Sequence, residues 1–374
     1  MKFSIERKYF YQKLSVAARA ISVFSPLPAL SGIHIDVKED SIVLTGSDSD
    51  ISIRTSIQPS EMNSLQIEST GSIVMESKYL LEIVRKIESP VITFELLDYE
   101  LIRIKSQNGE FNLNGISADQ YPAIDFKQPN QSIKLTKYQL HQIVSQTSFA
   151  CGDNNSQRPI LNGVNFLIKD NNLYCAGTDS YRLARKVIYM ENGDACNVTI
   201  PAKSLNELEK SLDEDTDHIY LYIDDKKAQF VFDQTIFQTR LLDGAFPDME
   251  RIIPTEYISK MVVNASELSH AIDRTNFIRN DKIHLIKMEC NNQLVRIKTS
   301  SSEIGNSDEV LTDCIYEGQS LSVTCNGSFL MDAIRACQSE KVVLEFSGEM
   351  RPIKITNPDD QSVVMVIVPV KSYD

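Results

Sequence analysis

Lys78-Tyr-Leu-Leu-Glu-Ile-Val-Arg-Lys-Ile87 returns in similar form as Lys203-Ser-Leu-Asn-Glu-Leu-Glu-Lys-Ser-Leu212 and as Ser328-Phe-Leu-Met-Asp-Ala-Ile-Arg-Ala-Cys337. The spacing is 125 residues in a chain of 374. A leucine, an acid and a base fall in register in the three stretches: Leu80, Leu205 and Leu330; Glu82, Glu207 and Asp332; Arg85, Lys210 and Arg335. Solenoid repeats run roughly 20–50 residues, so one copy per third indicates three similar domains instead.

Each third also opens with a second repeated stretch, in which apolar residues recur at the start, five later and nine later. The sets are Ile5/Phe10/Leu14, Leu135/Leu140/Val144 and Val263/Leu268/Ile272. The last two members of each set share a helical face, and Thr136 and Asn264 suit helix N-caps. Between the helices, polar turns such as Asp170-Asn-Asn172 and Asn108-Gly109 separate apolar runs, which is typical of β-hairpins. We therefore predict an α+β protein with antiparallel sheets and two helices per third.

The division into domains follows from the repeat and from two polar, proline-containing segments, Ala123–Ser132 and Ile253–Ser259. We expect domains at residues 1–127, 128–254 and 255–374, in line with about 100–200 residues per domain.

Several classes of protein are disfavoured by composition. No apolar run is long enough for a membrane span, and residues 1–8 have no apolar signal core, so we expect a cytoplasmic protein without a membrane partner. Seven cysteines without a CxxC pair predict free thiols, no disulfide framework and no zinc site. Phosphate-loop, dinucleotide and metalloprotease motifs are missing, so we expect no cofactor and no catalytic residues. Asp48, Asp50 and Asp179 follow glycines and are interpreted as turn residues in preference to metal ligands.

Charge is distributed unevenly along the chain. The net charge is −13, yet the first helix of each third (6–21, 136–150 and 264–282) holds eight basic and four acidic residues in total. In the second helices, Leu80, Ile83, Val84 and Ile87 form an apolar stripe, and the repeated base lies roughly opposite it. That face is either a solvated surface with weak ion pairs or a shared surface for an anionic partner. The base recurs at the same position in all three thirds, which argues against a face that is only solvated.

Four motifs give the chain a specific resemblance. They are Arg158-Pro-Ile-Leu-Asn-Gly-Val164, Gly177-Thr-Asp-Ser-Tyr-Arg-Leu-Ala184, Leu242-Asp-Gly-Ala-Phe-Pro-Asp248 and Val366-Ile-Val-Pro-Val-Lys-Ser-Tyr373. Together with the threefold repeat, they resemble the bacterial sliding clamp family, the beta subunit of DNA polymerase III. The resemblance runs from Met1 to the end of the chain.

The resemblance implies a head-to-tail homodimer of three clamp-type domains that closes a ring, with sheets outside and helices lining the hole. Its implied function is to encircle duplex DNA without sequence preference and to make the replicative polymerase processive, without catalysis of its own. A mildly positive lining in an acidic body suits this, because contacts to phosphates carry no sequence information. The implied DNA-facing residues are Arg7, Lys13, Lys78, Arg85, Lys137, Lys203, Lys210, Arg274 and Arg335.

The resemblance also implies two kinds of protein contact. A cleft takes short linear motifs of the polymerase, the clamp loader and repair proteins, and the matching positions are Leu161, Thr178, Tyr181, Arg182, Leu183, Pro247, Arg251, Ile252, Met350, Val366, Val368, Pro369, Val370 and Lys371. The dimer contact is implied for Phe111 and Leu113 against Phe277 and Ile278.

Three departures from the family pattern leave an alternative open. Tyr181 replaces a common histidine, Phe24 stands where some members carry a DNA-contacting arginine, and Lys371–Asp374 lengthens the tail. The alternative is a divergent clamp paralogue that mainly recruits peptides in repair or specialised replication.

Overall fold

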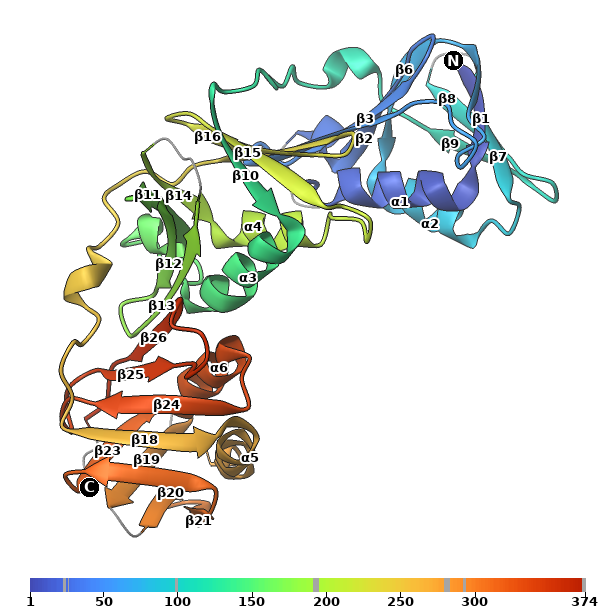
Figure 1. The fold of residues 1–374 in the computed structure, drawn as a ribbon. Coiled ribbons are helices and arrows are strands. Elements are labelled where there is room, and N and C mark those ends of the chain that lie inside the picture. Colours follow the sequence, from blue (N-terminus) through green and yellow to red (C-terminus); the bar gives the residue numbers. More distant parts are fainter. Residues whose placement is uncertain are drawn as a thin grey trace. The chain divides into compact units, whose positions relative to one another are not determined.

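The chain folds into two compact units. The computed structural model describes residues 1–22, 25, 27–97, 100–190, 195–278, 283–291 and 294–371. Unit 1 contains Met1–Lys137 and Lys203–Leu241, and unit 2 contains Tyr138–Ala202 and Leu242–Asp374. The middle third of the sequence therefore contributes to both units (Figure 1).

Unit 1 contains most of the first third and the second half of the middle third. Its described elements are β1 (Lys2–Glu6), α1 (Arg7–Ala18), η1 (Pro28–Ser31), β2 (Gly32–Val37), β3 (Ile42–Ser47), β4 (Ile51–Ile57), β5 (Gln66–Ser69), β6 (Gly71–Glu76), α2 (Ser77–Lys86), β7 (Val91–Leu96), β8 (Leu101–Lys105), β9 (Glu110–Asn114), η2 (Ala118–Gln120), β10 (Gln131–Thr136), α4 (Ala202–Glu209), β15 (His218–Ile223), β16 (Lys227–Phe232) and β17 (Thr235–Arg240).

Unit 2 contains the first half of the middle third and the last third. Its described elements are α3 (Lys137–Thr147), η3 (Ser148–Ala150), η4 (Pro159–Asn162), β11 (Gly163–Lys169), β12 (Asn172–Thr178), β13 (Arg182–Tyr189), β14 (Cys196–Pro201), η5 (Met249–Arg251), β18 (Ser259–Asn264), α5 (Ala265–Thr275), β19 (Leu285–Asn291), β20 (Leu294–Ser301), β21 (Gly305–Leu311), β22 (Cys314–Gly318), β23 (Leu321–Asn326), α6 (Gly327–Cys337), β24 (Lys341–Phe346), β25 (Ile353–Thr356) and β26 (Val363–Ile367).

The sheets join strands from different thirds of the sequence. Unit 1 has a five-stranded sheet, β5-β1-β7-β8-β9, and an eight-stranded sheet, β10-β15-β16-β17-β4-β3-β2-β6. Unit 2 has a nine-stranded sheet, β14-β11-β12-β13-β26-β25-β24-β18-β22, and a four-stranded sheet, β21-β20-β19-β23. Strand β17 joins β4 in unit 1 just as β26 joins β13 in unit 2. The strand pairs of the described residues are antiparallel, as the hairpin signals predicted.

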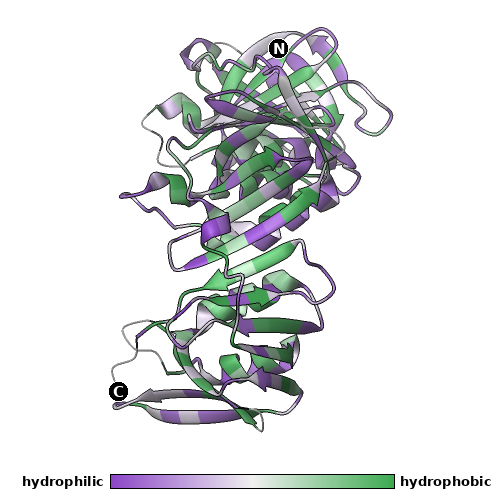
Figure 2. Ribbon diagram, turned by 60° about the vertical axis from the view of Figure 1, so that its left-hand side comes forward, coloured by the Kyte–Doolittle hydropathy of each residue, from purple (hydrophilic) through white to green (hydrophobic). Residues whose placement is uncertain are grey.

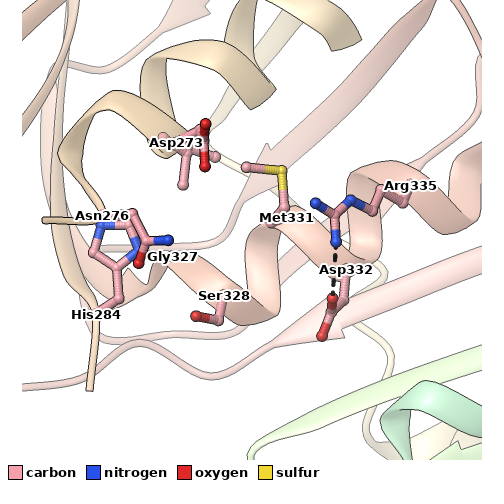
Figure 3. Close-up of a pocket in the computed structure, with 9 residues that line it drawn as sticks. Asp273, Asn276, His284, Gly327, Ser328, Met331, Asp332 and Arg335 are labelled. Carbon is pink, nitrogen blue, oxygen red and sulfur yellow. Dashed lines mark ion pairs between the residues drawn. The ribbon is translucent and has the colours of Figure 1, made fainter. Parts of the chain in front are cut away.

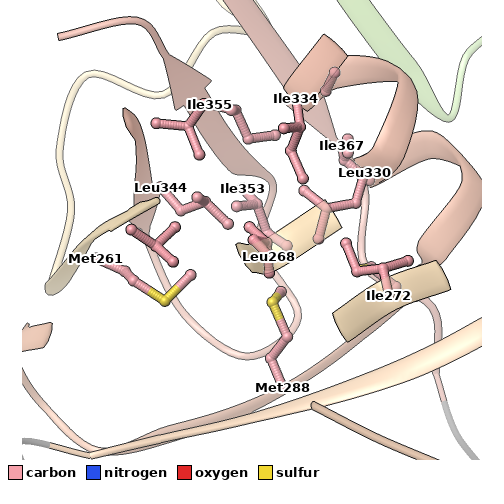
Figure 4. Close-up of a cluster of buried hydrophobic side chains, with 14 of the residues drawn as sticks. Met261, Leu268, Ile272, Met288, Leu330, Ile334, Leu344, Ile353, Ile355 and Ile367 are labelled. Carbon is pink, nitrogen blue, oxygen red and sulfur yellow. The ribbon is translucent and has the colours of Figure 1, made fainter. Parts of the chain in front are cut away.

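The repeated helices cover the sheets with the face that the sequence predicted. Leu80, Leu205 and Leu330, the leucines in register, are all fully buried. In unit 2, α5 and α6 place Leu268, Ile272, Leu330 and Ile334 against the residues of the surrounding strands (Figure 4). In unit 1, Phe3, Phe10 and Phe94 pack at centroid distances of 5.1–5.7 Å beneath α1. The strands carry both hydrophilic and hydrophobic residues (Figure 2), and buried and half-buried residues alternate along β18.

Helix boundaries follow local hydrogen bonding. The Asn264 side chain accepts from the backbone N–H groups of Ser266 and Glu267, which confirms it as the N-cap of α5. Asn326 caps α6 in the same way through Ser328. Helix α6 ends at Cys337. The next residue, Gln338, is the C-cap, and its left-handed φ of 50° prevents another helical turn.

Two glycines show how closely helix and sheet approach in both units. A Cβ on Gly46 would lie 2.1 Å from the carbonyl oxygen of Ala17 at the end of α1. A Cβ on Gly177 would lie 2.5 Å from the carbonyl oxygen of Thr147 at the end of α3. These equivalent positions in β3 and β12 accept only glycine without movement of the helix backbone.

Candidate functional site

The turn between β12 and β13 shapes one wall of a pocket in unit 2. Oδ1 of Asp179 accepts hydrogen bonds from the backbone N–H groups of Tyr181 and Arg182, both at 2.9 Å. Oγ1 of Thr178 donates to the Arg182 carbonyl at 2.6 Å and accepts from the N–H of Ser180. Asp48 accepts from Asp50 and Ile51 in the equivalent turn of unit 1. The prediction that Asp48 and Asp179 act as turn residues is confirmed.

Arg182 begins β13 and is held from several sides. Its Nε donates to Oδ2 of Asp179 at 2.9 Å, and its Nη1 donates to Oδ2 of Asp332 in α6 at 2.7 Å. The guanidinium also lies 4.3 Å from the ring centroid of Phe329 and 5.5 Å from that of Phe149. Ion pairs and cation–π contacts of a partly buried guanidinium fix its direction, so Arg182 is a positioned wall of the pocket and not a freely moving rim residue.

The pocket has an apolar floor and a more exposed mouth. Leu183 and Val366 face each other across the β13–β26 pair and are almost fully buried. Ile252 and Val368 stand at the mouth with exposed fractions of 37% and 39%. The cavity has a volume of about 190 Å³, and its lining residues are Arg158, Thr178, Ser180, Arg182, Leu183, Pro247, Ile252, Val366 and Val368.

Seven of the fourteen positions assigned to the cleft from the sequence line this cavity. Of the others, Leu161 is fully buried in η4, so its side chain is core and not pocket surface. Tyr181, Arg251, Met350 and Val370 are exposed outside the cavity lining, and Pro369 and Lys371 follow β26 in the chain.

Two lining residues were not among the predicted positions. Arg158 belongs to the first of the quoted motifs and Ser180 to the second, so the motifs contained the signal although neither residue was selected. Among the described residues, Arg158 makes no ion pair, whereas Arg251 lies 3.1 Å from Asp248 with 86% of its side chain exposed. Arg158 is therefore the cation of the pocket that is open to an incoming acidic group.

The basic residues predicted to face DNA fall into two groups. Members of the first group bind carboxylates or carbonyl groups of the protein itself. Lys13 has only 9% of its surface exposed and binds Asp213 at 2.9 Å, which corrects its assignment as a DNA-facing residue. Arg7 donates to the carbonyls of Val84 and Arg85, and Lys137 to those of Asp213 and Glu214. Arg274 binds Glu309 at 2.6 Å.

The second group remains exposed on the helices. Lys78 and Arg85 lie on α2, and Lys203 approaches Asp48 only to 3.9 Å with 78% of its side chain exposed. Arg335 lies on α6 with 72% of its side chain exposed, 3.9 Å from Asp332, in the shallow polar pocket between α5 and α6 (Figure 3). The face of these helices turned away from the core is therefore positive but sparse.

The repeated acid has a different partner in each third. Glu82 binds Lys86 at 2.6 Å and not Arg85. Glu207 binds both Lys210 and Arg19, and these partners hold the pKa of this carboxyl below its ordinary value although burial alone would raise it. Asp332 is directed to Arg182. Among these three acids, Glu207 alone lies within 3 Å of the repeated base three residues later in the chain.

The predicted dimer residues lie at sheet and helix ends. Phe111 and the half-buried Leu113 lie on β9, an edge strand of the five-stranded sheet. Phe277 follows α5 with 60% of its surface exposed. Ile278 is buried within unit 2, with 1% exposed, so its assignment as a contact residue is corrected. Phe24 and residues 372–374 lie outside the described residues.

Comparison with known proteins decides the family. Family models of the DNA polymerase III beta subunit match along the chain: the N-terminal domain at residues 1–125, the central domain at 134–248 and the C-terminal domain at 250–371. The chain belongs to the DNA polymerase III beta subunit family. Its relatives include beta sliding clamps of Staphylococcus epidermidis and Staphylococcus aureus, which are 36% and 35% identical over the whole of both chains.

Solved structures of beta subunits have the same fold. The DNA polymerase sliding clamp of Bacillus subtilis superimposes with a TM-score of 0.94 at 33% identity, over the whole of both chains. The beta chain of Streptococcus pneumoniae gives a TM-score of 0.95 at 30% identity, covering 99% of this chain and all of the other. This beta subunit thus consists of three clamp domains and is a non-catalytic processivity factor of DNA replication.

Two further observations concern membranes and metals. No helix of the described residues has the length and apolar character to cross a bilayer. Over the same ranges, no group of His, Cys, Asp and Glu side chains is arranged to hold a metal ion.

Proposed function

We propose that this beta subunit forms a head-to-tail homodimer, with clamp domains at residues 1–127, 128–254 and 255–374, that closes around duplex DNA. The observation that carries the dimer is a pair of free sheet edges with exposed aromatic residues near them. Strand β9 ends the five-stranded sheet of unit 1 and carries Phe111, and β21 ends the four-stranded sheet of unit 2. An exposed strand edge tends to pair with another chain, and heterologous pairing closes a ring when the rotation allows it.

The sparse positive face of the helices supports a sliding function. Lys78, Arg85, Lys203 and Arg335 are exposed, whereas most other predicted DNA contacts are bound to acids or carbonyls. Each phosphate contact adds affinity and salt dependence, so a dense basic lining would hold DNA in one place. A ring with few exposed bases retains DNA by closure and lets it move.

The pocket of unit 2 supports the docking of short linear motifs from the replicative polymerase, the clamp loader and repair proteins. Its floor of Leu183 and Val366 suits an aliphatic side chain of the motif. Arg158 suits an acidic or polar residue beside it.

Sedimentation equilibrium tests the dimer directly. The expected mass is about twice the 42.2 kDa of one chain. A monomeric mass at micromolar concentration would contradict the proposal.

Replacement of the housekeeping clamp in a reconstituted replication reaction separates the processive clamp from a peptide-recruiting paralogue. We expect long products with this chain. Short products together with normal peptide binding would favour the paralogue, whose exposed Tyr181 would then mark a changed partner preference.

A further inference from the structure

Unit 1 contains a pocket that is larger than the pocket of unit 2 lined by Arg182, Leu183 and Val366, and we call it the second pocket. It has a volume of about 490 Å³ and lies between the ends of β3, β4 and β17 and the segment that follows η2. Its lining includes Ser47, Ser52, Pro122, Lys226, Gln238 and Arg240, all of which belong to unit 1.

The two pockets are built in the same way. Gln238 faces Ser52 across the β17–β4 pair, as Val366 faces Leu183 across the β26–β13 pair. The backbone N–H of Arg240 donates to the Asp50 carbonyl at 3.0 Å, and that of Val368 donates to the Tyr181 carbonyl at 2.9 Å.

The adjoining turn and linker also correspond. Ser49 and Ser180 have left-handed φ values of 81° and 82° in equivalent turns. Pro122 follows Tyr121 along one pocket, and Pro247 follows Phe246 along the other. The second pocket is therefore the repeat-related counterpart of the pocket in unit 2.

The second pocket has a more polar lining than the first, although Leu30, Pro122 and Ile124 also contribute to it. Ser52, Gln238 and Arg240 take the places of Leu183, Val366 and Val368. The hydroxyl groups of Ser47 and Ser52 bond to each other, and Oε1 of Gln238 accepts from Gln229, so the charged side chains of the lining and Nε2 of Gln238 are the groups left to recognise a ligand.

Of the three acids that line this pocket, Asp224 and Asp125 are engaged by neighbouring groups, and Asp50 has Arg240 as its ion-pair partner. Oδ1 of Asp224 accepts from the backbone N–H groups of Lys226 and Lys227 at 2.8 and 2.9 Å. Asp125 accepts from the N–H of Lys127 and lies 3.6 Å from Nζ of Lys227. The N–H of Lys127 and the charge of Lys227 hold the pKa of this exposed carboxyl below its ordinary value.

Two of the bases are not engaged in this way. Lys226 is exposed and makes no ion pair among the residues that the structure describes. Arg240 reaches Asp50 only at 3.9 Å, with both side chains more than 70% exposed. Such an exposed pair is weak and exchanges readily for another carboxylate.

We propose that this second pocket is a docking site for an acidic, extended peptide segment of a partner protein. Carboxylates of the segment bind Lys226 and, in exchange for Asp50, Arg240, and a backbone carbonyl of the segment accepts from Nε2 of Gln238. The site is separate from the apolar pocket, so one partner chain with two motifs, or two partners, can occupy both.

A peptide-display selection tests this proposal. Random 12-residue peptides are selected on the full chain, and those that also bind the Lys226→Glu/Arg240→Glu double variant are removed. We expect the remaining peptides to carry at least two acidic residues and to lose ten-fold or more in affinity on the double variant, measured by fluorescence anisotropy. The thermal midpoint should stay unchanged, because both side chains are exposed.

Matched variants distinguish this site from general charge and from the apolar pocket. Lys169→Glu changes an exposed lysine elsewhere, and Val368→Asp changes the apolar pocket. Both variants should bind the selected peptides with an affinity within two-fold of the wild type.

Three results would overturn the proposal: no selected peptide depends on Lys226 and Arg240, Lys169→Glu loses as much peptide affinity as the double variant, or the selected peptides bind the apolar pocket. A further result would overturn the proposal: the double variant loses as much affinity for a short DNA duplex as for the peptides. Lys226 and Arg240 would then be DNA contacts.

Discussion

The guanidinium of Arg182 and the carboxylate of Asp332 form a 2.7 Å hydrogen bond that ties the start of β13 to the middle of α6. The two residues are 150 positions apart in the chain. Both lie within unit 2, where this bond joins the central part of the sequence to its last third. The residue that shapes the pocket lined by Leu183 and Val366 is therefore also a residue that stabilises the unit.

Arg182→Ala should reduce both peptide affinity and stability. Loss of the guanidinium removes the ion pairs with Asp179 and Asp332 and the contact with Phe329. We expect the free energy of unfolding from urea titration to fall by about 2 kcal/mol, within the range for hydrogen bonds to charged groups. Arg251→Ala is the control, and its exposed side chain should change stability by less than about 0.5 kcal/mol. Equal stability of the two variants would contradict the role given to Arg182.

Phe277→Asp and Ile278→Asp should have different consequences although the residues are adjacent. Phe277 is exposed, so its replacement should yield folded monomers in sedimentation. Ile278 is buried, and an unpaired carboxylate there costs several kcal/mol, so that variant should lose thermal stability first. Folded Ile278→Asp with a wild-type melting temperature would show that the burial is wrongly assigned.

Ser180→Gly should stabilise unit 2. The φ of 82° at Ser180 is strained for a residue with a Cβ, and glycine relieves this strain at some cost in chain entropy. The expected gain in the free energy of unfolding is about 0.5–1 kcal/mol. Ser180→Ala keeps the Cβ and should give no gain. An equal gain in the free energy of unfolding from Ser180→Ala would contradict backbone strain at Ser180.

Gly177→Ala should destabilise the same unit through the helix end. The new methyl group would press on the Thr147 carbonyl and on Sγ of Cys151, both closer than 3.0 Å. Overpacking of this kind costs about 1–3 kcal/mol. Gly109→Ala has no atom within 3.7 Å of the new methyl group and should be nearly neutral. An unchanged free energy of unfolding for Gly177→Ala would mean that α3 can shift away from β12 without loss of stability.

Acidification should weaken unit 2 through Asp360. Burial would raise the pKa of this carboxyl, but hydrogen bonds from Ser362 and from the buried Lys186 hold it below its ordinary value. A depressed folded-state pKa contributes stability above the unfolded-state pKa of about 3.9, and that stability is lost as the pH falls through the lower folded-state value. Urea midpoints at pH 7, 5 and 3 should therefore fall less steeply for Asp360→Asn than for the wild type. Asp359→Asn, at an exposed neighbour, should follow the wild-type profile.

The repeat made the helices predictable from the sequence, whereas contacts between residues far apart in the chain were not predictable. Leu80, Leu205 and Leu330 are buried as their register implied, because helical periodicity is a local property. Lys13 was assigned to DNA because nothing nearby indicates its partner Asp213, which is 200 residues away. Ile278 was assigned to the dimer contact from the family resemblance alone, and its burial depends on packing beyond the end of α5, where helical periodicity gives no information.

The most direct test of the central claim is the dependence of DNA retention on topology. The chain is loaded by a clamp loader onto a singly nicked plasmid, freed from unbound protein by gel filtration, and half of the complex is then cut once with a restriction enzyme. A closed ring should remain on the uncut circle and leave the cut DNA through its ends, with both samples in the same salt. Equal retention on circular and linear DNA would contradict a clamp that holds DNA by encircling it.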